Sequence, residues 1–428
     1  MRPEARIEQR ERWAAGFPVH VGVDAGKSFH KLVASGKSRV RTKALKVEAT
    51  RAGFDGAVAF LKKQFPGIRP SETLIGIEFA GHYGYTFGEY LRGLGYPIVT
   101  VPSVVTKRLK EIEDNSPRKD DAKDAAQICK LLGSGLFVSY AELSPAVAEL
   151  RVLTTERHRL AVEQIRLKNR LHSALDLAWP EFLPSFSGVQ HQTPRALLRR
   201  WPVAQDIAAA SVRSVYAVMR QASQNHFPRA KAETLVATAR SSIAVHAGLE
   251  SRRAEIRRLL DRWDVIAAQI GAIERTLAER VAQHPGAKAL VTVPEVGVLC
   301  AATLVAEVGT PESFESPRQV LKLAGMNLAR KESGTSIRGR VRQTKRGRPL
   351  LRRQLFLLAG RWCQADGIYR DEYLAMVERN GGRKISALCA MARRLVPMLL
   401  HVMQTGEAFD YARWQHDRLG ARGPYRAA

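Results

Sequence analysis

The stretch that decides the fold is "HVGVDAGKSFHKLVAS", residues 20–35. A run of apolar residues leads into Asp24, a turn follows at Ala25 and Gly26, and a second apolar run comes directly after it. The pattern predicts a buried strand, a tight turn and a second strand. Asp24 then stands at the end of a buried strand, where a carboxylate is costly unless something compensates its charge.

Strands and helices continue to alternate outward from this stretch. "TRAGFDGAVAFLKKQF" (50–65) and "YGYTFGEYLRGLGY" (83–96) have the apolar spacing of helices. "ETLIGIEFAG" (72–81) is a short buried strand that ends in Glu78, and "PIVTVPS" (97–103) is a further strand. We therefore expect an α/β layer sandwich over residues 1–145.

The chain then becomes helical. Two seams with a spacing near 3.5 residues predict long amphipathic helices within residues 146–285, either an antiparallel pair or an oligomerising coiled coil. Ordinary globular helices are the alternative. A smaller helical insert, about 180–245, lies between the seams and carries no chemistry that the sequence reveals. The seams consist of Leu150, Leu153, Leu160, Leu167, Leu171 and Ala174, and of Ile256, Leu260, Trp263, Ala267, Ile270, Leu277 and Val281.

The amino-acid composition changes again at Gly286, and we expect a separate C-terminal domain from there, residues 286–428. Its turn, residues 294–297, feeds an apolar helix and resembles a helix-hairpin-helix element, in which backbone N–H groups meet a phosphate. On its own this signal is weak, because many helix starts look like it. The expected fold class is α/β plus all-α.

Charge indicates the class of partner. The 428 residues include 68 Lys and Arg against 41 Asp and Glu, a formal charge of +27. Such a surplus attracts polyanions, and nucleic acid is the leading candidate. A ribosomal or merely basic protein is the alternative.

The cysteines and the apolar runs indicate the compartment. Four cysteines without a CxxC pair support neither a zinc site nor a disulfide framework, which suits a reducing cytoplasm. The N-terminus lacks the apolar core of a signal peptide, and no apolar run is read as long enough to span a membrane. We expect a cytoplasmic protein with no membrane partner.

Two further acids stand in "NSPRKDDAKDAAQICKLL", residues 115–132. Asp121 and Asp124 are three residues apart on a predicted helix and share one face, whereas Asp120 points elsewhere and is interpreted as a helix-start or solvent residue. A helix cap for Asp121 and surface ion pairs with neighbouring lysines are the alternatives for this pair.

Acids at the ends of two strands and on a nearby helix can converge. Asp24, Glu78, Asp121 and Asp124 could bind two divalent metal ions, which clamp the attacking and leaving oxygens of a phosphodiester displacement. Mg²⁺ suits such a site because it prefers hard oxygen ligands. The order of these acids in a basic protein favours this hypothesis over isolated surface carboxylates.

The order "VGVDAGK", "IGIEFAG", "KDDAKDA" resembles the DEDD catalytic domain of the IS110 transposase family, whose fold is like that of RuvC, a four-way-junction resolvase of the ribonuclease H class. The C-terminal "VTVPEVGVLCAATLVAEVG", "FESPRQVLKLAGM" and "TKRGRPLLRR" resemble the second transposase domain of that family. The resemblance implies that the metal-binding acids are Asp24, Glu78, Asp121 and Asp124, with two Mg²⁺ ions in each active site.

The resemblance also implies a nucleophilic serine that precedes a glycine. Ser333 in "KESGTS" matches it, with Ser336 as the competitor. The sequence departs from the family pattern just before the serine, where it has "NLARKE" in place of a proline and small polar residues. If the two ends of the chain meet, an acid or metal-bound hydroxide of the first domain could deprotonate this serine.

The serine lies in a strongly basic segment, residues 330–353, with ten Lys or Arg and one acid. Its glycines favour a loop or loose β-ribbon. We expect its cations to contact phosphates and to give affinity but no sequence selection, a solvated charge run being the alternative. The expected contacts are Arg338, Arg340, Arg342, Lys345, Arg346 and Arg348.

The sequence thus predicts a DNA recombinase that excises and inserts a mobile element by Mg²⁺-dependent cleavage with a serine nucleophile. The resemblance further implies a bridge RNA that pairs with donor and target DNA, and synapsis implies a homodimer or homotetramer. A junction nuclease that uses only the four acids, with Ser333 incidental, and a non-catalytic nucleic-acid-binding protein are the alternatives.

Overall fold

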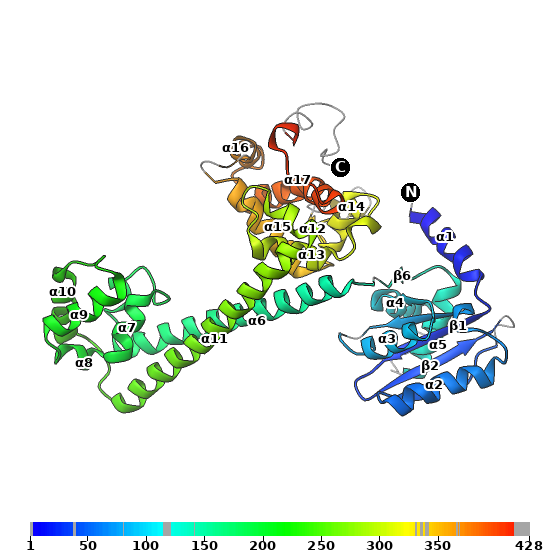
Figure 1. Cartoon of the computed structure of the whole chain (residues 1–428), viewed down its shortest axis with the longest axis horizontal. Coiled ribbons are helices and arrows are strands. Elements are labelled where there is room, and N and C mark those ends of the chain that lie inside the picture. Colours follow the sequence, from blue (N-terminus) through cyan, green and yellow to red (C-terminus); the bar gives the residue numbers. More distant parts are fainter. Residues whose placement is uncertain are drawn as a thin grey trace. The chain divides into compact units, whose positions relative to one another are not determined.

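The chain folds into two compact units, Met1–Glu142 and Leu143–Ala428 (Figure 1). The computed structural model describes residues 3–36, 40–79, 81–113, 121–140, 142–329, 332–333, 337–338, 342–364, 367 and 369–414. Each unit has hydrophobic clusters of its own.

The first unit is built on a six-stranded sheet in the order β3-β2-β1-β4-β5-β6. β1 pairs in parallel with β4, and β4 with β5, whereas the other neighbours are antiparallel. The strands are β1 (Val19–Ala25), β2 (Phe29–Ser35), β3 (Leu45–Glu48), β4 (Thr73–Glu78), β5 (Ile98–Thr100) and β6 (Val138–Ser139).

Helices cover both faces of this sheet. On one face Val21, Val23 and Leu32 pack with Phe54 and Phe87. On the other face buried residues of the strands pack with α5, because successive side chains of a strand point to opposite faces. The helices are α1 (Pro3–Ala15), α2 (Arg51–Gln64), η1 (Pro70–Glu72), α3 (Tyr85–Gly93), α4 (Ser103–Glu113) and α5 (Asp121–Gly133).

The second unit is organised around two long helices, α6 (Pro145–Ala178) and α11 (Leu249–Gln283). Ser144 caps the start of α6 by accepting the N–H of Val147 at 3.3 Å. The buried ends of the helices pair in opposite order, Val147 with the Val281 end and Leu171 with the Ile256 end, so the two helices are antiparallel. Both predicted seams therefore lie on one intramolecular helix pair.

A polar interruption in the first seam has a structural role. Arg157 donates to Glu274 across the pair, with an N···O distance of 2.7 Å. The charge is compensated because its partner lies on the facing helix, and the half-buried guanidinium therefore does not break the packing.

Smaller helices cover both ends of this pair (Figure 1). Between α6 and α11 lie η2 (Leu183–Ser185), α7 (Gln192–Arg200), α8 (Ala204–Ala208), α9 (Val212–Ser223) and α10 (Arg229–Arg240). After α11 follow α12 (Pro285–Val291), α13 (Val298–Val308), η3 (Pro311–Ser313), α14 (Pro317–Leu323), α15 (Pro349–Trp362), α16 (Arg370–Arg379) and α17 (Lys384–Thr405). The short strands β7 (Leu328–Ala329), β8 (Glu332–Ser333), β9 (Ile337–Arg338) and β10 (Arg342–Gln343) separate α14 from α15.

One helix corrects the expectation about the apolar runs. Among the described residues, α17 alone is long and apolar enough by length and composition to cross a membrane. However, 56% of its most apolar 18-residue stretch is buried inside the protein, and residues such as Leu395 and Leu399 belong to the core of the second unit. These are the surroundings of a core helix.

The coarse fold prediction is confirmed: the N-terminal part is a mixed α/β sheet with helices, and the rest is mainly helical. The four cysteines form no disulfide with one another. Burial raises the pKa of the Cys129 thiol to about 11, so this group stays protonated and packs as an apolar side chain.

Candidate active site and nucleic-acid interface

Two of the predicted acids are neighbours across the sheet. Asp24 of β1 pairs directly with Glu78 of β4 in the parallel register. Adjacent strands lie about 4.8 Å apart, and residues in register point to the same face, so the two carboxylates share one side of the sheet. Both side chains are half-buried.

Helix α5 covers the face that carries these acids. A Cβ at Gly22 would lie 2.1 Å from the carbonyl oxygen of Ala125, so only glycine allows the helix this close. The thiol of Cys129 donates to the carbonyl oxygen of His20 at 3.3 Å. Since later residues of α5 meet earlier residues of β1, the helix runs antiparallel to the strand.

This direction brings the start of α5 level with Asp24. From Gly22 to Asp24 the strand advances about 6.6 Å, which equals roughly four residues of helix. Four residues before Ala125 is Asp121, the first residue of α5. The Asp121 side chain and the whole of Asp120 lie outside the described residues. Asp124, in the same turn, is buried with 8% of its surface exposed.

The register reveals two lysines that the sequence analysis missed. Lys31 of β2 pairs with Asp24, and Lys46 of β3 pairs with Lys31. A row of two cations and two acids therefore crosses four neighbouring strands on the face toward α5. Beside it, Asp24, Lys31 and the turn residue Lys27 line a small pocket of about 190 Å³. The alternation of side chains within "SFHKL" would have placed Lys31 on the same face of the sheet as Asp24 if the register of the hairpin between the two strands had been known.

The acids supply hard oxygen donors, which fit Mg²⁺ in chemistry. The fold brings Asp24 and Glu78 side by side, and the start of α5 adds further carboxylates close to them. Among the described side chains, which do not include that of Asp121, no group of three or more His, Cys, Asp or Glu residues is placed to hold one metal ion. Of the four predicted acids, Asp24, Glu78 and Asp124 are described, and the sheet register places the first two side by side.

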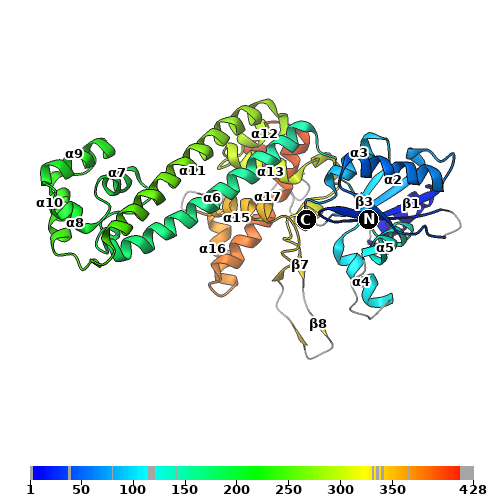
Figure 2. The same cartoon turned by 90° about the horizontal axis from the view of Figure 1, so that it is seen from below.

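The basic segment of the second unit forms a β-ribbon. β7 pairs antiparallel with β10, and β8 with β9, in which Ser333 is opposite Ile337. Figure 2 shows β7 and β8 extending away from the helices of this unit. At its base Thr344 donates to the side chain of Asn327 at 2.6 Å. The Ser333 side chain and all of Ser336 lie outside the described residues.

The predicted phosphate contacts fall into two groups. Arg342, Lys345 and Arg346 are exposed and make no ion pair with the described acids. Arg348 instead donates to the carbonyl oxygen of Glu307 at 2.8 Å and precedes α15, so part of its hydrogen-bonding capacity is used within the fold. The Arg338 side chain and all of Arg340 lie outside the described residues.

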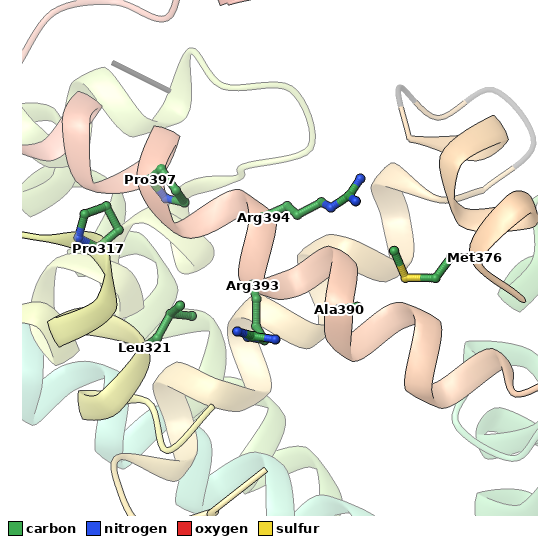
Figure 3. Close-up of a pocket in the computed structure, with 7 residues that line it drawn as sticks. All are labelled: Pro317, Leu321, Met376, Ala390, Arg393, Arg394 and Pro397. Atoms are coloured by element: carbon green, nitrogen blue, oxygen red, sulfur yellow. The ribbon is translucent and has the colours of Figure 1, made fainter. Parts of the chain in front are cut away.

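A cationic pocket of about 250 Å³ lies between α14, α16 and α17 (Figure 3). Arg394 pairs with Glu372 of α16. Arg393 leaves α17 on the side of Leu321 and has no acidic partner among the described residues. The pocket thus offers one uncompensated guanidinium to an anion.

Comparison with known proteins identifies the family. The model of the DEDD domain of IS110 elements, described as a transposase, matches residues 21–180. A second model, described as "Transposase IS116/IS110/IS902 family", matches residues 287–374. Together the two models match more than half of the chain, and the first begins within β1 and covers β4, α5 and all four predicted acids.

Relatives match over nearly the full length. The chain is 26% identical over 403 residues to the insertion element IS110 uncharacterized 43.6 kDa protein of Streptomyces coelicolor, covering 92% of this chain and 95% of that protein. It is 23% identical to the IS116 protein of Streptomyces clavuligerus, over 92% and 96% of the two chains. It is 24% identical to the IS900 protein of Mycobacterium paratuberculosis, over 89% and 94%. The chain is therefore a member of the IS110 family of transposases, enzymes that recombine the DNA of insertion elements.

Proposed function

We propose that this transposase cleaves and exchanges DNA strands with the carboxylates Asp24, Glu78, Asp121 and Asp124. The observation that carries the proposal is the register that pairs Asp24 with Glu78 beneath the first turn of α5. Carboxylates on two rigid strands and one helix are held more firmly than carboxylates on loops, as a precise donor set requires.

These acids would hold divalent cations, Mg²⁺ in the cell and two in each site. When bound, the cations supply Lewis-acid stabilisation of the charge that develops on the phosphate. The protein's own part is to fix the donor oxygens, and α5 contributes by closing one side of the site. Without cations, the clustered carboxylates would repel one another and the DNA backbone.

Lys31 and Lys27 would hold the scissile strand. Both line the pocket beside Asp24, and Lys31 lies in the cross-strand row next to it. A lysine ammonium attracts a phosphate as a compact charge, so these side chains offset the repulsion between the acids and the DNA. We assign them to positioning.

Ser333 is the proposed nucleophile. Its Oγ attacks the phosphorus of one strand, an Oγ–P bond forms, the bond from phosphorus to a DNA oxygen breaks, and the freed DNA hydroxyl takes up the proton. Ser336 is the competing candidate. The exposed cations Arg342, Lys345 and Arg346, with Arg338, Arg340 and Arg348, would hold the phosphates of the bound DNA.

We also propose a specific fold for the first unit and a division of the chain into three domains. The sheet order supports a RuvC-like fold for the first unit. We propose the organisation 1–145, 146–285 and 286–428, in which the turn before α13 acts as a helix-hairpin-helix-like element.

We propose two kinds of partner for this transposase, a guide RNA and further copies of the same chain. A guide RNA that pairs with donor and target DNA is implied by the family resemblance, and the charge of +27 is compatible with it. A homodimer or homotetramer is supported by exposed apolar side chains on the helix pair, such as Val152 and Val265. Such a complex would be cytoplasmic and associated with the nucleoid.

The test compares full-length variants on a supercoiled plasmid that carries the element ends. Asp24→Asn is expected to abolish Mg²⁺-dependent cleavage and to weaken Mn²⁺ binding measured by calorimetry. The control Asp55→Asn, at an ion pair with Arg51 on the opposite face of the sheet, should leave both unchanged. Full activity of Asp24→Asn would contradict the role of the acids.

Ser333→Ala tests the nucleophile in the same assay. It is expected to abolish recombination and the protein–DNA adduct that survives denaturation, whereas the control Ser313→Ala retains both. If Ser333→Ala still cuts DNA in Mg²⁺, the metal-only nuclease replaces the serine mechanism, and transfer of the adduct to a peptide with Ser336 would reassign the nucleophile.

A further inference from the structure

The helical insert contains a pocket to which nothing above assigns a role. Its volume is about 720 Å³, and it is lined by residues 184–187, 191–194, 222–223 and 226–227. These segments are η2 with the turn after it, the start of α7 and the end of α9. The volume lies within the range typical of sites for small ligands.

Two phenylalanines line this pocket. The rings of Phe186 and Phe227 are perpendicular, with their centroids 6.0 Å apart. Phe182, fully buried behind them, fixes Phe186 at a centroid distance of 5.1 Å. Both lining rings remain partly exposed, so a flat ligand could stack on a surface that is already in position.

A polar group in the same pocket lacks a partner. Ser223 is one of the residues that line the cavity, and its Oγ is buried and makes no hydrogen bond among the described residues. Leaving a buried hydroxyl without a hydrogen bond costs folding free energy. If the Ser223 side chain rotates about its Cα–Cβ bond toward the cavity, a ligand that accepts from or donates to this hydroxyl would recover that cost.

The backbone after α9 is strained beside this serine. Gln224 and Asn225 are both left-handed, with φ of 52° and 67°. Two successive residues other than glycine in this region cost free energy, and such strain is concentrated at functional sites. The turn delivers His226 and Phe227 to the pocket wall.

Two features beside the pocket attract anions. No side chain caps the N-terminus of α7, whose Gln192 and Thr193 line the pocket, so its N–H groups and the helix dipole are available to an anion. The Nζ of Lys231 lies 5.6 Å from the centre of the Phe186 ring and has no ion-pair partner within the described chain. Residues 181–245 contain eight Lys or Arg against three acids.

We infer that this pocket binds one unpaired nucleotide of a nucleic-acid strand. The base stacks on one ring of the Phe186–Phe227 pair and meets the other, perpendicular ring with its edge. The Ser223 hydroxyl, once its side chain turns into the cavity, hydrogen-bonds the base or its sugar, and the phosphate lies toward Lys231 and the start of α7. A base inside a duplex cannot reach these rings, because both of its faces are stacked. The ligand is therefore a flipped base or a single strand.

The inference rests on nucleic-acid binding by a transposase and not on the acids or the serine of the proposed mechanism. Two strands could supply the nucleotide: a loop of a guide RNA, or DNA unpaired during strand exchange. The same contacts serve both, so the comparison of RNA with DNA identifies the source.

The experiment measures binding of full-length protein to a short single-stranded RNA, the single-stranded DNA of the same sequence, and the duplex DNA. Phe186→Leu preserves apolar volume but removes the stacking ring. Because stacking on one ring contributes about 1–3 kcal/mol, it is expected to weaken single-strand binding by about 5- to 150-fold. Duplex binding and the thermal midpoint should change little. A larger loss for RNA than for DNA assigns the pocket to the guide, and the reverse assigns it to unpaired DNA.

Tyr216→Leu is the matched control, since it removes a partly buried ring of α9 that does not line the pocket. Photocrosslinking of a strand that carries 4-thiouridine or 4-thiothymidine should label the peptides with Phe186 or Phe227. The inference fails if Phe186→Leu binds single strands like Tyr216→Leu, or if crosslinks map only to other segments. It also fails if Phe186→Leu alters the oligomeric state and leaves nucleic-acid binding intact.

Discussion

In the first sheet, Asp24 has a lysine on one neighbouring strand and a glutamate on the other. Lys31 pairs with Asp24 across β1 and β2, and Glu78 pairs with Asp24 across β1 and β4. One carboxylate therefore has a cation on one side and a second carboxylate on the other. Lys31 attracts a phosphate that comes close to these side chains. The neighbouring carboxylates repel it unless bound metal cations neutralise their charge.

Lys31→Gln tests this placement. Loss of one phosphate contact is expected to reduce the slope of log affinity for DNA against log salt concentration by about 0.9. The thermal midpoint should hardly change, because the side chain is only half-buried. The measurement is DNA affinity over a range of NaCl concentrations.

Lys62→Gln is the control for the same loss of charge. Lys62 is exposed in the last turn of α2, which packs against the opposite face of the sheet. An equal slope for the wild type and Lys31→Gln would show that this lysine does not touch DNA.

The sequence predicted that Asp24 and Glu78 lie close together, but it did not predict that Lys31 lies beside them, and the reason is physical. Asp24 and Glu78 each follow an apolar run, and the prediction that they lie together assumes that their strands are neighbours, as the parallel register shows them to be. The partner of Asp24 on β2 depends on how many residues the turn between the strands absorbs, which composition does not reveal. Hairpin pairing similarly decides that Ser333 is opposite Ile337.

At the scale of elements, two glycines determine how closely α5 approaches the sheet. Gly22 and Gly76 each stand two residues before a strand-end acid and face the helix. The Gly76 position would bring a Cβ within 2.7 Å of a Leu132 methyl group. Small residues at these positions let the backbone of α5 lie on the strands and set the depth at which Asp124 is buried.

Gly22→Ala is expected to destabilise the first unit by about 1–3 kcal/mol, as overpacking does. The new methyl group meets backbone atoms of Ala125 and Cys129, which cannot rotate away, so α5 must shift. Cleavage should fall because the first turn of α5 moves away from Asp24. Thermal unfolding and the plasmid assay measure the two effects.

Gly56→Ala supplies the comparison. Gly56 lies in α2 with open space where the methyl group of an alanine would stand, and alanine favours helix by about 0.5–1 kcal/mol. It should raise the midpoint and leave cleavage unchanged. A Gly22→Ala protein as stable and active as Gly56→Ala would mean that the close approach of α5 is not needed.

The nucleotide pocket of the insert shows what periodicity cannot predict. Phe186 follows α6 in the sequence, whereas Ser223 and Phe227 lie at the end of α9 and after it. The turns that carry Phe186 and Phe227 have no repeating apolar pattern, and the apolar pattern of α9 reports only its core-facing side. Only the packing of α7 against α9 brings them together, so no local signal identifies the site.

At the scale of the whole molecule, the two units have separate hydrophobic clusters. The first unit is built around the sheet, where Leu32 is fully buried. The second is built around the helix pair and α12–α17, where Leu355 of α15 is buried. Alternation of strands and helices predicted the elements of the first unit, and the two seams predicted the long helix pair within the second, because each pattern reports which face of an element is buried.

Separate cores predict separate unfolding transitions in calorimetry of the full chain. Leu32→Ala and Leu355→Ala should each cost about 2–5 kcal/mol, because each leaves a cavity in one core. Leu32→Ala is expected to lower the midpoint of one transition and Leu355→Ala that of another, with the remaining heat absorption unmoved in each case. A single transition that both variants shift together would mean that the units unfold as one cooperative body, and damage to either core would then reach the acids and the β-ribbon alike.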